Sequence, residues 1–330
     1  MPEINPIRQL GIHPLISHPS LPKTLHLNQN ELCIYTAHRQ SRSRHGAGSP
    51  YGIGRSLVLS LAQAGAKAVY ATDLTLANIP SLQKEVKEAG SSCEVHGKVL
   101  DVTSEDQTVA VLKEVIEKYG RLDFYFANAG FGSYKTLQDT DAKYYDFTIS
   151  VMQRSFFLAL KYGGQAMCTT SPDKPSSGGS IIVTSSMAGV AGAVSDLSYS
   201  TAKAAVAGMV KSASVQLAAS HIRVNSIAPG FIRTSILATT ASTVSGAAFG
   251  EELDKNGADD VFESVFGRRK GEKYYYNRIP EPIEIANIGV FLASDLSAAV
   301  NAQNIVADSG KTTAAFGESI IPPIEPLKPL

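Results

Sequence analysis

The stretch Gly46-Ala-Gly-Ser-Pro-Tyr-Gly-Ile-Gly54 stands directly before a segment with helical periodicity that begins at Arg55. Glycines let a backbone approach a ligand closely, and a helix N-terminus supplies free N–H groups and a partial positive charge. The stretch therefore predicts a loop that binds a pyrophosphate, and a glycine-rich turn without a ligand is the alternative. The residues predicted to form this binding loop are Gly46, Gly48, Gly52, Ile53 and Gly54.

Beyond this loop, short apolar runs alternate with segments of helical periodicity. The predicted strands are Lys67–Thr72, Glu94–Leu100, Asp123–Ala127, Ser180–Ser185, Ile222–Ile227 and Asn304–Ala307. The predicted helices are Arg55–Ala64, Ile79–Ala89, Glu105–Tyr119, Ala142–Met167, Ser198–Ala219 and Glu281–Ala293. Alternation at these lengths favours right-handed crossovers between parallel strands. We therefore expect a single α/β domain with a doubly wound, Rossmann-like parallel sheet.

The composition narrows the classes of partner. The chain has 330 residues, 44% of them apolar and 18% charged, which is enough apolar material for a large core. Lys plus Arg and Asp plus Glu number 30 each, so no field of one sign attracts nucleic acid or a membrane surface. The three cysteines are widely spaced, and no apolar run approaches the roughly 20 residues of a membrane helix. We expect a cytoplasmic protein without a metal site.

Asp73 closes the predicted strand that follows the glycine loop, about 20 residues further on. A carboxylate at this point suits the hydroxyls of an adenosine ribose and repels a 2′-phosphate. Asp73 therefore favours NAD over NADP, and a solvated turn at the strand end is the alternative.

Tyr199 and Lys203 are four residues apart on a predicted helix, so they share one face. A phenol has a pKa of about 10, which a nearby ammonium lowers, and a carbonyl that receives a hydride also needs a proton. An exposed helix pair has the same spacing. Ser186 precedes Tyr199 by thirteen residues at the end of a strand, where its hydroxyl would donate to a substrate carbonyl.

These motifs resemble, in order and spacing, those of the short-chain dehydrogenase/reductase family over residues 46–310. They are Gly46–Gly54, Asp73, Asp101, Asn128-Ala129-Gly130, Ser186, Tyr199-Ser-Thr-Ala-Lys203 and Pro229-Gly230. The resemblance implies that Tyr199 is the general acid/base, that Lys203 binds the nicotinamide ribose and lowers the tyrosine pKa, and that Ser186 orients the carbonyl.

The resemblance also implies the remaining cofactor contacts. Asp101 would contact the adenine, Asn128 would lie beside the cofactor, and Thr234 would bond the carboxamide. The full set of expected cofactor-binding residues is Gly46, Gly48, Gly52, Ile53, Gly54, Asp73, Asp101, Val102, Asn128, Ala129, Gly130, Tyr199, Lys203, Pro229, Gly230, Ile232 and Thr234. Family members form homodimers or homotetramers through the helices that begin here near Ala142 and Ser198.

One departure from the family lies at Met152, where an asparagine is usual. That asparagine holds a water that relays protons to the lysine. Methionine fills the space but cannot carry the relay, so we expect slowed turnover. The glycine loop is also two residues longer than the commonest form, although Gly48, Gly52 and Gly54 fit the shorter spacing.

The N-terminal part departs further. The family places an apolar strand directly before the first glycine, and Arg39-Gln-Ser-Arg-Ser-Arg44 stands there instead. The run Glu31–Ala37 also has the composition of a strand. We interpret residues 1–45 as an atypical extension or a misassigned start, residues 46–312 as the domain, and residues 313–330 as a proline-rich tail.

Two further regions bear on function and stability. The segment 235–279 is the expected substrate lid, and its aromatic residues, Phe262, Phe266 and Tyr274–Tyr276, favour an apolar substrate, with subunit packing as the alternative. Near the C-terminus, Asn301-Ala302 and Asp308-Ser309-Gly310 replace the more usual Thr-Gly and Asp-Gly-Gly. These exchanges keep small side chains, so we expect little effect.

The sequence thus predicts an NAD(P)(H)-dependent oxidoreductase that interconverts a secondary alcohol and a ketone. The alternative is a catalytically impaired relative that serves as a cofactor-binding or scaffolding module. Met152 and the polar stretch before Gly46 favour the alternative, whereas the complete set of Ser186, Tyr199 and Lys203 favours the enzyme.

Overall fold

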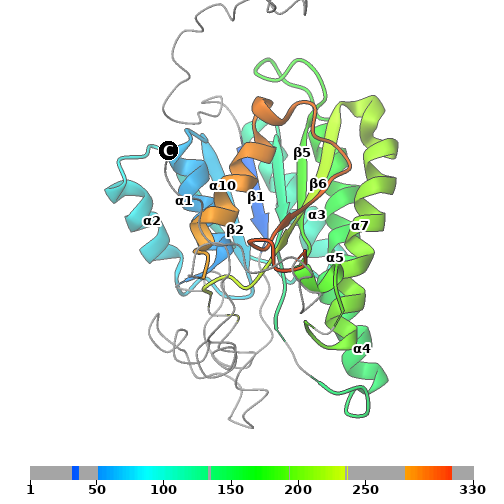
Figure 1. Cartoon of the computed structure of the whole chain (residues 1–330). Helices are drawn as coiled ribbons and strands as arrows, with labels where there is room; N and C mark the ends of the chain where they lie inside the picture. Colours follow the sequence, from blue (N-terminus) through cyan, green and yellow to red (C-terminus); the bar gives the residue numbers. More distant parts are fainter. Residues whose placement is uncertain are drawn as a thin grey trace, which may run out of the picture.

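The computed structural model describes residues 32–36, for which only the backbone is considered, and residues 51–132, 135–192, 194–234, 236 and 279–313. Their core is a seven-stranded parallel sheet with the order β3-β2-β1-β4-β5-β6-β7 (Figure 1). The strands are β1 (Leu32–Thr36), β2 (Ala68–Asp73), β3 (Glu94–Val99), β4 (Phe124–Ala127), β5 (Gly179–Thr184), β6 (Ile222–Pro229) and β7 (Asn304–Ala307). The predicted doubly wound α/β fold is confirmed.

The first strand corrects the expected start of the domain. β1 pairs in parallel with β2 on one side, Leu32 opposite Ala68, and with β4 on the other, Cys33 opposite Phe124. A strand in the middle of a doubly wound sheet has both faces covered, which suits Leu-Cys-Ile-Tyr-Thr and not the run of arginines. The sheet therefore begins before the expected boundary at Gly46, and sixteen residues separate β1 from the first helix.

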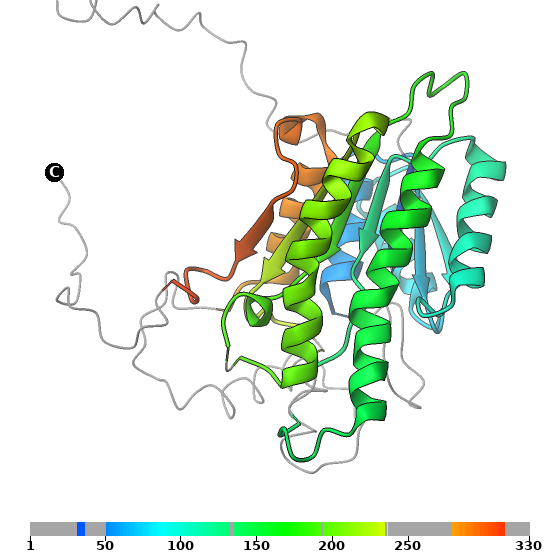
Figure 2. The ribbon, with the colours of Figure 1, turned by 90° about the vertical axis from the view of Figure 1, so that its right-hand side faces the viewer.

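Helices cover both faces of the sheet. They are α1 (Ile53–Gln63), α2 (Ile79–Glu88), α3 (Glu105–Tyr119), α4 (Ala142–Ile149), α5 (Ser155–Leu158), α6 (Gly164–Met167), α7 (Leu197–Leu217) and α10 (Pro282–Ala293). One layer contains α1, α2 and α10, and the other contains α3, the α4–α6 helix and α7. Figure 2 looks onto the second layer and shows α7 beside the long α4–α6 helix.

The side chains of the central strand β4 alternate between two apolar cores. Phe124 and Phe126 of β4 pack into the core beneath α1, α2 and α10. Tyr125 and Ala127 of the same strand pack into the core beneath α3, α5 and α7. This alternation follows from the two-residue period of a strand, and it explains why β4 is apolar along its whole length.

The predicted helix Ala142–Met167 is continuous, but it contains two π-helical segments, Ser150–Arg154 and Ala159–Gly163. A π-helical turn inserts an extra residue into the helical repeat and is frequent at functional sites. The first of these turns holds Met152, which is completely buried. The periodicity of the sequence does not reveal such turns, because they leave the residues before and after them helical.

The prediction for two of the C-terminal replacements needs correction. Ala302 and Ser309 have φ angles of 63° and 56°, in the left-handed region that favours glycine. Both stand where the family usually has glycine. The expectation of little effect considered only the size of the side chain. These two positions instead favour a residue without a Cβ atom.

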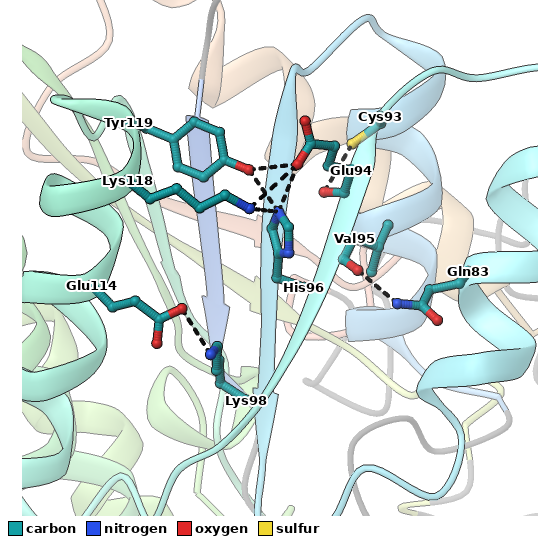
Figure 3. A network of polar contacts seen from close by, with 9 residues as sticks. All are labelled: Gln83, Cys93, Glu94, Val95, His96, Lys98, Glu114, Lys118 and Tyr119. Carbon is teal, nitrogen blue, oxygen red and sulfur yellow. Dashed lines mark hydrogen bonds and ion pairs between the residues drawn. The ribbon is translucent and has the colours of Figure 1, made fainter.

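A polar network joins the edge strand β3 to the end of α3 (Figure 3). The hydroxyl of Tyr119 lies 2.6 Å from the Nε2 atom of His96 and donates to Glu94 at 2.8 Å. Lys118 Nζ lies 3.3 Å from the same nitrogen of His96. Burial and the neighbouring Lys118 lower the pKa of His96, which favours the neutral imidazole. These contacts account for His96 as a structural residue.

Several predicted regions lie outside the described residues. They include most of the lid with its aromatic residues, the proline-rich tail beyond residue 313, and most of residues 1–45. The predictions for these regions stay predictions. Among the residues that are described, no helix is both long and apolar enough to cross a membrane.

Candidate active site

The carboxyl ends of the strands place the predicted site residues at one edge of the sheet. Asp73 ends β2 and Asp101 follows β3, whereas Asn128 follows β4 and Gly230 follows β6. These ends share an edge because all the strands are parallel. β1 lies between β2 and β4, so the chain order reverses there, and open α/β sheets bind ligands at this reversal.

Tyr199 and Lys203 lie one turn apart near the start of α7. Lys203 is 2% exposed, and its Nζ donates to the carbonyl oxygen of Thr184 at 2.7 Å. The same nitrogen lies 5.7 Å from the centre of the Tyr199 ring. Burial lowers the pKa of Lys203 to about 7, so small changes around this amine decide whether it is charged at neutral pH.

Hydrogen bonds connect Lys203 to the ends of two strands. Thr184, which accepts from the lysine through its backbone, donates through its hydroxyl to Asn128 Oδ1 at 2.8 Å. Ser185 Oγ donates to the carbonyl oxygen of Lys203 at 3.0 Å. The structure therefore brings Asn128, the end of β5 and the lysine of α7 together around one amine.

Met152 lies beside this amine. A Cβ atom at Gly130 would be 3.4 Å from the Sδ atom of Met152 and 3.8 Å from Nζ of Lys203, so the three residues are neighbours. Met152 packs with Phe131, and Tyr199 packs against the same cluster. The site where the family has an asparagine thus faces the lysine, but the thioether has no proton to donate.

Ser186 follows β5 and begins the short 3-10 turn Met187–Gly189. Its Oγ accepts a hydrogen bond from the backbone N–H of Ala188 at 3.1 Å, which leaves its own proton for another acceptor. A Cβ at Gly189 would lie 2.6 Å from the carbonyl carbon of Lys203. Only glycine permits this close approach, which seats the serine turn on α7.

The start of α1 fits an anionic group. Gly52 precedes the helix, which begins at Ile53, and Gly54 is buried in its first turn. No side chain caps this helix and its first turn carries no acid, whereas α3, α4 and α7 each have a capping side chain. An uncapped helix start next to glycine is suited to a pyrophosphate. Gly46 and Gly48 lie outside the described residues.

The ends of β3 and β4 form a small apolar cluster. Val102 and Ala129 pack there with Leu100. The carboxylate of Asp101 turns back on the chain and accepts from the backbone N–H and the hydroxyl of Thr103 at 2.9 and 2.7 Å. The arrangement offers a flat aromatic ring an apolar surface next to a polar rim.

The loop after β6 has features that suit a carboxamide. β6 ends at Pro229, and a Cβ at Gly230 would lie 2.7 Å from the Cα atom of Asp308, so the loop is pressed against the C-terminal segment. Ile232 is buried, and the buried Oγ1 of Thr234 has no hydrogen-bond partner among the described residues. Buried hydroxyls normally have a partner, so this one fits a bound polar group.

Sequence reasoning missed two residues that touch the catalytic pair. Asp196 caps α7 by accepting from the backbone N–H of Tyr199 at 2.8 Å, which fixes where the helix begins. An acid three residues before Tyr199 was the available signal. Phe156 places its ring centre 4.8 Å from Nζ of Lys203. Nothing in the sequence distinguishes Phe156 from an ordinary core residue.

A third contact was also missed. Glu281 accepts through Oε2 from the hydroxyl of Tyr51, next to the glycine loop, and its Oε1 lies 3.3 Å from Nε of Arg233. Burial raises the pKa of Glu281. This carboxylate therefore joins the glycine loop, the loop after β6 and the start of α10.

Comparison with known proteins agrees with this geometry. Residues 46–312 match a family model described as enoyl-(acyl carrier protein) reductase. A 3-oxoacyl-[acyl-carrier-protein] reductase from Thermotoga maritima is 32% identical over 263 residues, which is 80% of this chain and 94% of the relative. The chain belongs to the short-chain dehydrogenase/reductase family.

Two further members of the family cover a similar range. A 3-alpha-(or 20-beta)-hydroxysteroid dehydrogenase from Mycobacterium tuberculosis is 29% identical over 80% of this chain and 86% of its own length. The crystal structure of levodione reductase superposes with a TM-score of 0.70 at 26% identity, covering 86% of this chain and 98% of that one. The chain is accordingly an NAD(P)-dependent oxidoreductase that interconverts alcohols and ketones, and these relatives give no support to the scaffolding alternative.

Proposed function

We propose that this chain uses NAD(H) to interconvert an apolar ketone and its secondary alcohol, with Ser186, Tyr199 and Lys203 as its catalytic residues. The observation that carries the assignment is the buried Lys203, held by the Thr184 carbonyl one helical turn from Tyr199. Lysine side chains are rarely fully buried, because burial penalises their charge. A buried lysine therefore indicates a functional role. Here the amine lies 5.7 Å from the centre of the Tyr199 ring, close to the phenol whose pKa a positive charge would lower.

The roles of the three side chains follow from their chemistry. Bound cofactor supplies the hydride. Ser186 donates a hydrogen bond to the carbonyl oxygen, which polarises the ketone. The hydroxyl of Tyr199 would give its proton to the same oxygen, which completes the alcohol and leaves a tyrosinate. Lys203, when charged, stabilises the tyrosinate that is left and lowers the barrier to proton transfer.

The preference for NAD is argued from Asp73. Its carboxylate ends β2, is 3% exposed, and accepts from the backbone N–H of Leu74 at 2.6 Å. A carboxylate at this strand end is a partner for ribose hydroxyls and is repelled by a phosphate. We therefore expect NADH to bind more tightly than NADPH.

The apolar substrate is argued from the surroundings of Tyr199. Phe131 and Phe147 stack at 5.6 Å between ring centres, and with Tyr144 they form the apolar cluster that Tyr199 packs against. The relatives' names refer to a hydroxysteroid and to a 3-oxoacyl group, which both carry their oxygen on an apolar skeleton. Both observations favour an alicyclic or long-chain ketone.

The setting of the enzyme is part of the proposal. Phe157 of α5 is 50% exposed and Val215 of α7 is 77% exposed, on the helices through which the family forms oligomers. We propose a homodimer or homotetramer that buries them. The widely spaced cysteines favour the reducing cytoplasm.

A direct assay tests the assignment. The purified chain should consume NADH when offered a panel of alicyclic, steroid and 3-oxoacyl ketones, and a variant with Tyr199→Phe should not. Consumption by the variant at the wild-type rate would overturn the role of Tyr199. A folded wild-type protein that leaves NADH unchanged with every ketone would overturn the substrate class.

A further inference from the structure

The ammonium of Lys203 has an unusual environment. The side chain is almost completely buried, and the Thr184 carbonyl is its one hydrogen-bond acceptor among the described residues. An ammonium has three protons to donate. In water each would be solvated, so this site must stabilise the charge in another way or lose it.

An aromatic ring is the other main neighbour. Nζ of Lys203 lies 4.8 Å from the ring centre of Phe156, closer than its 5.7 Å to the ring of Tyr199. Phe156 is 1% exposed and belongs to α5, directly after the π-helical turn of Met152. The face of an aromatic ring carries partial negative charge and attracts a cation, most strongly where water is excluded.

We propose that Phe156 is a positioning residue for the reaction: its ring face holds the Lys203 ammonium against the Thr184 carbonyl and favours its charged form. The inference rests on the proposed function of Lys203 and adds a residue to it. Met152 fills the space on the adjoining turn without offering a polar atom that donates. The ring therefore supplies part of the stabilisation that a polar side chain or a water would otherwise give to the buried ammonium of Lys203.

The surroundings isolate this contact from other charges. Among the described residues, Thr184, Phe156, Met152 and Gly130 lie around Nζ, and none of these titrates. Tyr199, on the same helix, is the one titratable neighbour within the described part of the chain. Burial accounts for the lowered pKa of Lys203, so no carboxylate of the described residues competes with the ring for the cation.

The first test measures stability against pH without cofactor. The folded lysine is charged below about pH 7 and neutral above it, whereas in the unfolded chain it stays charged to about pH 10.4. The contact between the charged lysine and the ring therefore contributes to the stability of the fold only below about pH 7. Phe156→Leu should lower the unfolding midpoint more at about pH 6 than at about pH 9. At the lower pH the extra loss should be about tenfold in the folding equilibrium constant. This corresponds to 1.36 kcal/mol, the value for a change of one unit in the pKa of Lys203.

Matched variants separate this effect from loss of packing. Phe124→Leu removes an equally buried ring from the opposite core, so its cost should not vary with pH. In a Lys203→Met background, the cost of Phe156→Leu should become equally flat. A flat difference in the natural background, or the same pH dependence in both backgrounds, would overturn the proposal. Phe156→Met, with similar volume and no ring, gives the same comparison if the leucine variant does not fold.

The second test measures catalysis. In Phe156→Leu the lysine loses its charge at lower pH, so kcat/KM relative to wild type should be lowest near pH 8 and should recover towards pH 6, by about tenfold. Phe156→Tyr keeps a ring and should restore the wild-type profile. A uniform loss at every pH would contradict the inference. If wild type binds no NADH, the proposed function fails, whereas the cofactor-free stability test still decides the role of Phe156.

Discussion

The proposed chemistry depends on the hydroxyl group of Tyr199, which is the one group that a phenylalanine at this position would lack. Tyr199→Phe keeps the ring in its apolar cluster and the cap from Asp196, but it removes the proton donor. General acid catalysis contributes about 10²- to 10⁴-fold, so kcat should fall by at least about 10²-fold. Steady-state kinetics measures this, and an unchanged Kd for NADH shows that the site is intact. An unaltered kcat would remove Tyr199 from the mechanism.

Met152 presents two opposing effects at one position. An asparagine would give Lys203 a polar neighbour and a place for a relay water, so Met152→Asn should raise kcat. The same amide enters a fully buried apolar cluster, which should cost about 1–3 kcal/mol of stability. Kinetics and a thermal melt on one preparation measure both. If kcat stays the same in folded protein, proton relay does not limit this enzyme.

Ala302 and Ser309 carry a backbone cost that glycine would remove. A residue with a side chain in the left-handed region is strained by about 1–2 kcal/mol. Ala302→Gly and Ser309→Gly should each stabilise the fold by about 1 kcal/mol, or about 2–4 °C in the unfolding midpoint. Gly192→Ala, which has open space around it and no positive φ, serves as the reverse control and should change little. Destabilisation by either glycine would show that the strain is relieved in solution.

The places of the motifs in the fold follow from the sequence, whereas their roles stay predictions. Ser186 and Asn128 follow strands and Lys203 lies on α7, as the order of the motifs and the family resemblance imply. Phe156 could not be predicted in this way. Its importance comes from the distance to a lysine 47 positions later, and an aromatic residue in an apolar helix is ordinary.

At the scale of elements, Glu281 fastens the start of α10 to the glycine loop through Tyr51. Tyr51→Phe removes this hydrogen bond, so the start of α1 loses a contact with α10 that holds it before cofactor binds. We expect Kd for NADH to rise about three- to tenfold with little change in kcat. Tyr162→Phe is a matched control, since Tyr162 also donates to a carboxylate, that of Glu105, away from the site. Equal effects of the two variants on the Kd for NADH would exclude a specific role for the hydrogen bond between Tyr51 and Glu281.

The elements themselves were predicted to within one or two residues, β1 included, but the place of β1 in the sheet was not predicted. Its five residues are too short to show periodicity, and the polar run after them separates them from the glycine loop. What identifies β1 is pairing with β2 and β4, which is a property of the sheet. The π-helical turn at Met152 is hidden for a similar reason, because side-chain packing produces it.

At the scale of the whole molecule, parallel strands bring distant motifs to one edge of the sheet, and this predicted convergence is what makes a site possible. The central claim is that this edge binds a nicotinamide cofactor. The chain has no tryptophan from which energy transfer to NADH could be measured, so the fluorescence of NADH itself should be followed. We predict a saturable enhancement with NADH and a weaker one with NADPH. Folded protein that enhances the fluorescence of neither would contradict it.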